Sequence, residues 1–206
     1  MAIEARYHDI LRAACDVFAR RGFHQASIRE IARAAGLSLA GLYHYVGGKD
    51  ELLFLVLDRS LEALAAELDD ALTIAEAPDA RLLALIQTHL DFGFRHAAAL
   101  KIINRDFELL SDPERSEIAA KRQSYIQRGL TILRELDRDG RSGDELLSAT
   151  NLLLGMLNGI ATRPFVRSDE DARTLAGKVG RLFLYGFLAG SSDRSGTVPA
   201  AVGARP

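Results

Sequence analysis

Hydrogen-bonding side chains gather between residues 27 and 49 of this 206-residue chain. Tyr43, His44 and Tyr45 stand in a row, Lys49 follows them, and Ser27 precedes a run that is typical of a helix. Short hydroxyls, an ammonium group and the free N–H groups of a helix start all donate to phosphate oxygens. An imidazole can in addition bond to the edge of a base. These residue types therefore indicate contact with a nucleic acid.

Two short helices joined by a tight turn must position these groups. The first is expected to begin at Ser27, because Ser27 and Glu30 have the spacing of a capping box. Apolar residues then repeat along one helical face: Ile28, Ile31, Ala32 and Ala35. Gly36 is expected to end this helix in the left-handed conformation, and Ser38 can cap a second helix over Leu39–Val46. This arrangement matches the helix-turn-helix, whose second helix enters the major groove of DNA.

The side chains of this segment divide into two kinds of expected DNA contact. Phosphate contacts are expected from Ser27, Tyr43, Tyr45 and Lys49, and base contacts from Ser38, Leu39, Ala40, Gly41 and His44. The expected second helix carries no Arg or Lys for bidentate recognition of guanine, so we expect apolar contact with thymine methyl groups and a hydrogen bond from His44. Three alternatives stay open: Tyr43 as a core aromatic, Lys49 as a solvated helix start, and Leu39 packed against Leu42 and Val46.

This segment resembles the signature of the TetR family of transcriptional regulators. The run G-L-S-x-x-x-L-Y-x-Y-x-x-x-K, from Gly36 to Lys49, carries the resemblance. Flanking residues that also fit are Ser27, Glu30, Ile31, Ala32 and Asp50 to Leu53. The chain departs from the family pattern at Val46, Gly48 and Ala40-Gly41. Gly41 inside the second helix should cost about 1 kcal/mol of helix propensity relative to Ala. The resemblance implies the DNA contacts assigned above.

The rest of the chain also has helical periodicity, so the expected fold is all-α with about nine helices. The sequence has no strand-like alternation and no repeat. The further helices are expected at about residues 3–21, 49–74, from 78 onward, 97–110, 113–137, 143–162 and 169–188. We expect a helix-turn-helix DNA-binding domain at 1–48 and a helical ligand-binding and dimerisation domain at 49–190. A tail rich in Gly, Ser, Pro and Ala, residues 191–206, is expected to be disordered.

The TetR resemblance implies a ligand cavity and a homodimer. The candidate lining residues are Phe92, His96, Ile103, Phe107, Tyr125, Met156 and Asn158. Residues 105–125 and 155–166 loosely resemble the bodies of members that answer to acyl-CoA thioesters. The implied ligand is a hydrophobic small molecule, with an acyl-CoA as one candidate and Lys121 and Arg122 as groups that could meet its phosphates. The implied dimer forms through residues 143–162 and 169–188 and binds a palindromic operator in double-stranded DNA.

Composition narrows the other possibilities. Cys15 is the only cysteine, which excludes an internal disulfide and a cysteine zinc cluster and favours a buried structural thiol over a redox sensor. His89 and His96 lie on one helical face without a carboxylate or Cys ligand nearby, so no metal site and no cofactor are expected. No apolar run is long enough to span a membrane, and residues 1–12 do not resemble a signal peptide. We therefore expect a cytoplasmic protein without membrane contact.

The expected function is a ligand-responsive transcriptional regulator that is not an enzyme: a repressor released from its operator by a hydrophobic small molecule. Other readings stay open. One is a repressor of an efflux system that senses drug-like amphiphiles, and another is an activator. A third is a helical small-molecule binder or enzyme that does not bind DNA, although the sequence lacks the G-x-S-x-G, H-E-x-x-H and P-loop motifs.

Overall fold

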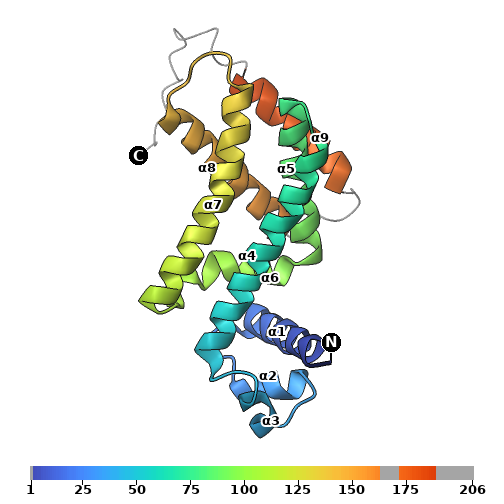
Figure 1. The fold of residues 1–206 in the computed structure, drawn as a ribbon, viewed down its shortest axis with the longest axis vertical. Coiled ribbons are helices and arrows are strands. Elements are labelled where there is room, and N and C mark those ends of the chain that lie inside the picture. The colour runs from blue at the N-terminus through green and yellow to red at the C-terminus, as the bar shows by residue number, and fades with distance from the viewer. Residues whose placement is uncertain (1, 163–171, 189–206) are drawn as a thin grey trace, which may run out of the picture.

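The structure is a computed structural model that describes residues 2–162 and 172–188. Every regular element within these residues is helical, in agreement with the all-α prediction (Figure 1). The helices are α1 Ala2–Arg21, α2 Ile28–Ala34, α3 Leu39–Tyr43, α4 Lys49–Ile74, α5 Pro78–Arg95, α6 Ala97–Arg105, α7 Asp112–Leu136, α8 Gly143–Thr162 and α9 Ala172–Phe183. A short 3-10 helix, η1, spans Phe107–Leu109, and a π-helical turn, η3, continues α9 over Leu184–Leu188.

Helices α1, α2 and α3 form a small head at one end of the molecule (Figure 1). The face of α1 that carries Ile10, Ala14, Val17 and Phe18 is fully buried, because these residues share one side of the helix. Buried residues of α2 and α3, including Leu42, belong to the same core. Gly36 has a φ of 68°, and it therefore supplies the left-handed turn predicted between α2 and α3.

Helix α4 runs from the head into the body. It has 26 residues, which corresponds to a length of about 39 Å. Its apolar face, from Leu52 to Leu68, is buried, and it packs against α1 in the head and against α5, α6 and α7 in the body. The two parts of the molecule therefore share one helix.

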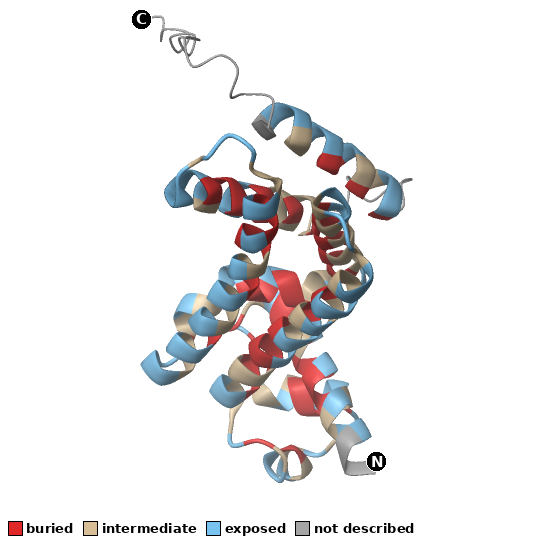
Figure 2. Ribbon diagram, turned by 45° about the horizontal axis from the view of Figure 1, so that its top comes forward, coloured by how far each residue is buried: buried red, intermediate tan, exposed pale blue. Residues whose placement is uncertain are grey.

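Helix α5 lies at the centre of the body and packs against α4, α7, α8 and α9. Buried residues follow the faces where these helices meet (Figure 2). A Cβ atom added at Gly93 of α5 would lie 2.4 Å from the Cβ of Ala161 in α8. One added at Gly129 of α7 would lie 2.9 Å from a methyl group of Thr150 in α8. These two glycines therefore allow α8 to approach its neighbours closely.

Two helices are shorter than predicted. The second helix of the helix-turn-helix was expected to reach Val46, but α3 ends at Tyr43, because the N–H groups of residues 45 and 46 both bond to the Leu42 carbonyl and Gly47-Gly48 follow. The helix expected over 97–110 ends at Arg105, where the buried Asp106 begins a 3-10 turn. The predicted start of the last helix at residue 169 and the tail at 191–206 lie outside the described residues.

Candidate nucleic-acid interface and ligand pocket

Two serines start the helices of the helix-turn-helix. The Ser27 Oγ accepts a hydrogen bond from the Glu30 N–H at 3.1 Å, and the Ser38 Oγ accepts one from the Gly41 N–H at 3.0 Å. The Glu30 carboxylate does not complete the predicted capping box but accepts from Arg21 Nε at 3.4 Å. Each serine oxygen acts as an acceptor in its cap, so its own O–H can still donate to a phosphate.

The outward face of α3 presents most of the expected DNA contacts. Tyr43 is 50% exposed, so it is not a core aromatic, and Ser38, Ala40 and His44 are also exposed. Leu39 is half-buried and lies outside the core cluster that contains Leu42 and Val46.

Gly41 has a local reason to lack a side chain. A Cβ atom at this position would lie 3.1 Å from the Ser38 Oγ, which is tighter than ordinary van der Waals contact. Glycine thus leaves room for the cap that starts α3, and this offsets part of its cost in helix propensity.

Lys49 ties the start of α4 to the loop before α2. Its Nζ donates to the carbonyl oxygens of Phe23 at 2.9 Å and Ala26 at 3.2 Å, and it lies 4.3 Å from the centroid of the Phe23 ring. The alternative of a solvated helix start is therefore wrong. The phosphate contacts expected from Lys49 and from the half-buried Tyr45 remain predictions.

The second half of α6 is hydrogen-bonded to the C-terminal end of α1. Lys101 Nζ donates to the Ala19 carbonyl at 3.0 Å, and Arg105 donates to the Phe18 carbonyl at 2.8 Å. The buried Asp106 carboxylate holds Arg105 by two hydrogen bonds, at 2.7 and 2.6 Å, and these bonds raise the pKa of the guanidinium. Two cations thus lie at the negative end of the α1 dipole. A displacement of α6 must disturb these bonds to the head.

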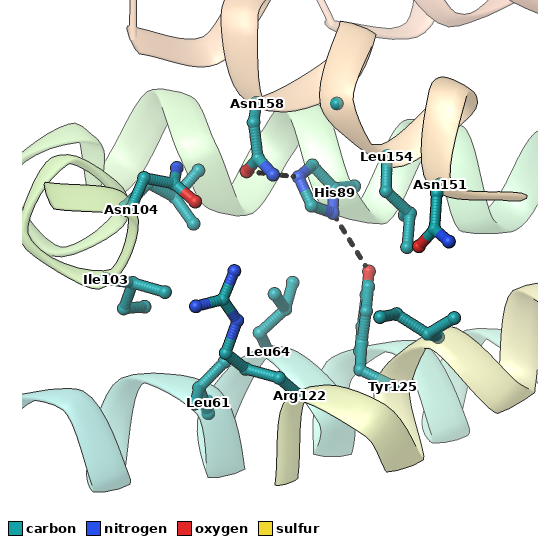
Figure 3. Close-up of a pocket in the computed structure, with 13 residues that line it drawn as sticks. Leu61, Leu64, His89, Ile103, Asn104, Arg122, Tyr125, Asn151, Leu154 and Asn158 are labelled. Atoms are coloured by element: carbon teal, nitrogen blue, oxygen red, sulfur yellow. Dashed lines mark hydrogen bonds between the residues drawn. The ribbon is translucent and has the colours of Figure 1, made fainter. Parts of the chain in front are cut away.

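A cavity of about 350 Å³ lies in the body, between α4, α5, α6, α7 and α8 (Figure 3). Its lining residues are Leu61, Leu64, His89, Leu100, Ile103, Asn104, Arg122, Tyr125, Ile126, Asn151, Leu154, Gly155 and Asn158. Three of them come from α6, the helix that is bonded to α1. A ligand in this cavity would therefore contact a helix of the body that is hydrogen-bonded to the head.

His89 is the centre of a buried hydrogen-bond chain in the cavity wall (Figure 3). Its Nδ1 lies 3.1 Å from the Tyr125 hydroxyl, and its Nε2 lies 3.2 Å from the Asn158 Oδ1. Burial lowers the pKa of His89 to about 4 and raises the pKa of Tyr125, so both are neutral near pH 7. Because an amide oxygen only accepts, Nε2 must carry the proton and Nδ1 must accept from Tyr125.

Arg122 brings a charge to the cavity. It extends from α7, and its guanidinium points toward the side where Asn158 lies (Figure 3). The guanidinium carbon is 4.9 Å from the centroid of the Phe107 ring. No carboxylate in the described part of the chain pairs with it. The cavity wall therefore combines leucine and isoleucine side chains with one cation and several amides.

The structure brings only some of the predicted ligand residues to this cavity. Ile103, Tyr125 and Asn158 line it. The other four lie elsewhere: Phe92 is buried beside His96, with ring centroids 4.6 Å apart, His96 is exposed, Phe107 stacks on Arg122, and Met156 faces a groove near α9. The prediction did not include His89, Asn104 or Asn151, whose positions depend on how five helices meet.

A second, more open depression lies between α8 and α9. Its floor is apolar and includes Leu152, Leu153, Met156 and Leu182. Leu152 is 74% exposed and Leu182 67%, and Tyr185 of η3 is 75% exposed. An apolar surface of this kind on a single chain is typical of a protein–protein interface.

Burial raises the pKa of the half-buried Cys15 thiol to about 12, which agrees with a structural thiol. Among residues 2–162 and 172–188, no helix is long and apolar enough to cross a membrane, and no three His, Cys, Asp or Glu side chains gather as a metal site would require.

Two family profiles match the chain. The profile "Bacterial regulatory proteins, tetR family" matches residues 10–56, and the profile "Tetracyclin repressor-like, C-terminal domain" matches residues 75–162. Among curated proteins, the HTH-type transcriptional regulator HbdR of Aromatoleum sp. (strain CIB) is 29% identical over 129 residues, which are 63% of this chain and 53% of HbdR. The chain spans about half the length of the curated relatives it matches.

Solved structures share the fold. A TetR-family transcriptional regulator from Bordetella parapertussis 12822 is similar with a TM-score of 0.82 and 26% identity, over 89% of this chain and 96% of that one. AibR, solved in complex with isovaleryl coenzyme A and operator DNA, is similar with a TM-score of 0.76 and 25% identity, over 86% of this chain and 98% of that one. Because one profile matches the head and the other the body of a fold that these regulators share, the chain belongs to the TetR family of bacterial regulatory proteins.

Proposed function

We propose that this protein is a cytoplasmic transcriptional regulator that represses by binding a palindromic operator and leaves it when a hydrophobic small molecule binds. The observation that carries the proposal is the double role of α6. This helix lines the cavity with Leu100, Ile103 and Asn104, and it donates hydrogen bonds to α1 of the head through Lys101 and Arg105. Ligand binding in the cavity and DNA binding by the head therefore favour different positions of α6.

On the DNA side, α3 enters the major groove. Tyr43 donates to a phosphate and His44 bonds to a base edge, and both are exposed. Ser27 and Ser38 add phosphate and base contacts through hydroxyls that are free to donate. The apolar surface of Leu39 and Ala40 faces thymine methyl groups. Lys49 acts chiefly by fixing the loop before α2.

On the dimer side, α8 and α9 pair with the same helices of a second copy. The exposed apolar side chains Leu152, Leu182 and Tyr185 support this assignment, since they would be covered in a homodimer. Two copies then place their α3 helices about 34–36 Å apart, one turn of DNA, which suits a palindrome.

On the ligand side, the proposed signal is a hydrophobic small molecule that binds in the cavity of the body. AibR was solved with isovaleryl coenzyme A, which makes an acyl-CoA one candidate for this chain. Whatever the ligand, it releases DNA only to the extent that it prefers one conformation over the other. A shift of α6 passes to α1 through the two bonds described above and to α4 through direct packing, so that the head tilts.

The test is selection of bound fragments from a random DNA pool by the purified protein. The native protein is compared with a Tyr43→Phe, His44→Ala double variant. The matched control is His8→Ala, which changes an exposed histidine of α1. We expect a palindrome enriched by the native protein and by the control but not by the double variant. Affinity for that palindrome should fall steeply with salt. A folded, dimeric protein that enriches no sequence would refute the proposal.

A further inference from the structure

The cavity holds one charged side chain, Arg122, that pairs with no carboxylate of residues 2–162 and 172–188. His89 and Tyr125 are neutral, so Arg122 is the only charged group among the lining residues that the structure describes. Two carboxylates of α4 near α7 are paired with another cation. Asp58 and Glu62 of α4 both accept from Lys121, the latter at 2.8 Å. Arg122 is half-buried, and burying part of a charge without a counter-ion is costly, so a negatively charged ligand would gain free energy by pairing with it.

The Asn158 side chain supplies a second donor beside Arg122. The Asn158 Oδ1 accepts from His89 Nε2, and the Asn158 NH₂ group therefore remains to donate. Arg122 has five N–H donors in a planar fork, which suits two oxygens of one carboxylate. The polar end of the cavity thus offers donors from two helices, α7 and α8, to an oxygen-bearing anion.

The rest of the cavity suits an apolar body of limited size. Six leucine and isoleucine side chains line it: Leu61, Leu64, Leu100, Ile103, Ile126 and Leu154. Its volume of about 350 Å³ lies at the low end of the range of about 300–1,000 Å³ for ligand pockets. A coenzyme A thioester would bring several phosphate charges to a wall that holds one cation.

We infer that the cavity binds a small carboxylic acid, with the carboxylate paired to Arg122 and donated to by Asn158, and with an apolar chain or ring against the leucines. This inference rests on the proposed function only in naming the acid as the signal that releases DNA. The free acid, and not its coenzyme A thioester, is then the preferred ligand.

The test is a comparison of acids with their primary amides on the full-length protein. The probes are the straight-chain acids of six to twelve carbons and 4-phenylbutyrate, each with its amide, and octanoyl-CoA. Dissociation constants come from calorimetry. We expect at least one acid to bind at least tenfold more tightly than its amide. In Arg122→Gln this preference should fall below threefold, and in Arg122→Lys it should be intermediate, because Lys keeps the charge without the fork.

Controls separate a role in binding from a role in folding. Arg115→Gln changes a half-buried arginine of the same helix that pairs with Asp112 and does not line the cavity, and it should leave the preference unchanged. Circular dichroism without ligand checks that each variant is folded. The inference is overturned if no acid binds, if acids and amides bind equally, if octanoyl-CoA binds more tightly than octanoate, or if Arg122→Gln keeps the preference.

DNA binding without ligand is measured separately, and Arg122→Gln should retain it. A protein that binds the acid but no DNA would refute the proposed function and leave the ligand assignment standing. A protein that binds its operator but shows no preference for an acid over its amide would refute the ligand assignment and leave the proposed function standing.

Discussion

Acid should destabilise this protein through His89. The pKa of this imidazole is about 4 in the folded protein because burial disfavours its charged form, whereas it is about 6.5 in an unfolded chain. A folded-state pKa below the unfolded one means that the contribution is fully present above pH 6.5 and is lost as the pH falls toward 4. Between pH 7 and pH 4.5 the free energy of unfolding should drop by about 2 kcal/mol from this group alone.

The assay is urea unfolding followed by circular dichroism at several pH values between 7 and 4.5. The protein concentration is kept fixed, because the stability of the proposed dimer would depend on it. His89→Gln has no such group, so its stability should vary less with pH than that of the native protein, by about 2 kcal/mol over this range. Carboxylates with lowered pKa, such as Glu62 and Asp69, contribute equally to both proteins and cancel. His8→Gln, at an exposed position, is the control.

Equal pH dependence in the native protein and His89→Gln would refute this reasoning. So would an NMR titration of the His89 ring with a midpoint near 6.5. Either result would mean that the imidazole is hydrated in the cavity wall and that its hydrogen bonds to Tyr125 and Asn158 do not hold it in the neutral form.

Three other variants test separate parts of the structure. Arg105→Gln removes a hydrogen bond from α6 to α1, so it should leave ligand affinity unchanged but reduce the ligand-dependent loss of operator affinity severalfold. A titration of labelled operator with and without ligand measures this loss. An unchanged ratio of the two operator affinities would contradict the prediction. Gly93→Ala places a methyl group against Ala161 and should lower the free energy of unfolding by about 1–3 kcal/mol; no loss in urea unfolding would mean that α5 and α8 can separate freely. Leu152→Glu combined with Leu182→Glu puts carboxylates on the exposed apolar face and should shift the protein from dimer to monomer in analytical ultracentrifugation; a persistent dimer would place the interface elsewhere.

The head could be predicted from sequence because its determinants are local. Ser27 and Ser38 each cap the helix that follows by accepting from the N–H three residues ahead. Gly36 supplies the turn through its own positive φ. The length of α3 was overestimated, because the turn that ends it depends on the Leu42 carbonyl accepting two N–H groups. Periodicity alone does not show where such a competing bond forms.

The cavity could be predicted only in part, because its wall is built from distant segments. His89 meets Tyr125 and Asn158, which lie 36 and 69 residues further along the chain. Phe92 lies on the same helix, and its aromatic character made it a candidate, but it turns toward His96. A histidine among the buried positions of α5 indicated a polar group in the core. Its hydrogen-bond partners could not be assigned without knowing how α7 and α8 pack.

The bonds between α6 and α1 end on backbone oxygens, those of Phe18 and Ala19. A backbone oxygen is present whatever side chain the residue carries. Substitutions along α1 that preserve the helix therefore leave the connection intact. Under the proposed function, the sequence of α3 can then change without loss of the response to ligand. A head taken from another regulator of this fold could then be joined to this body, and the hybrid would answer the same signal at a different operator.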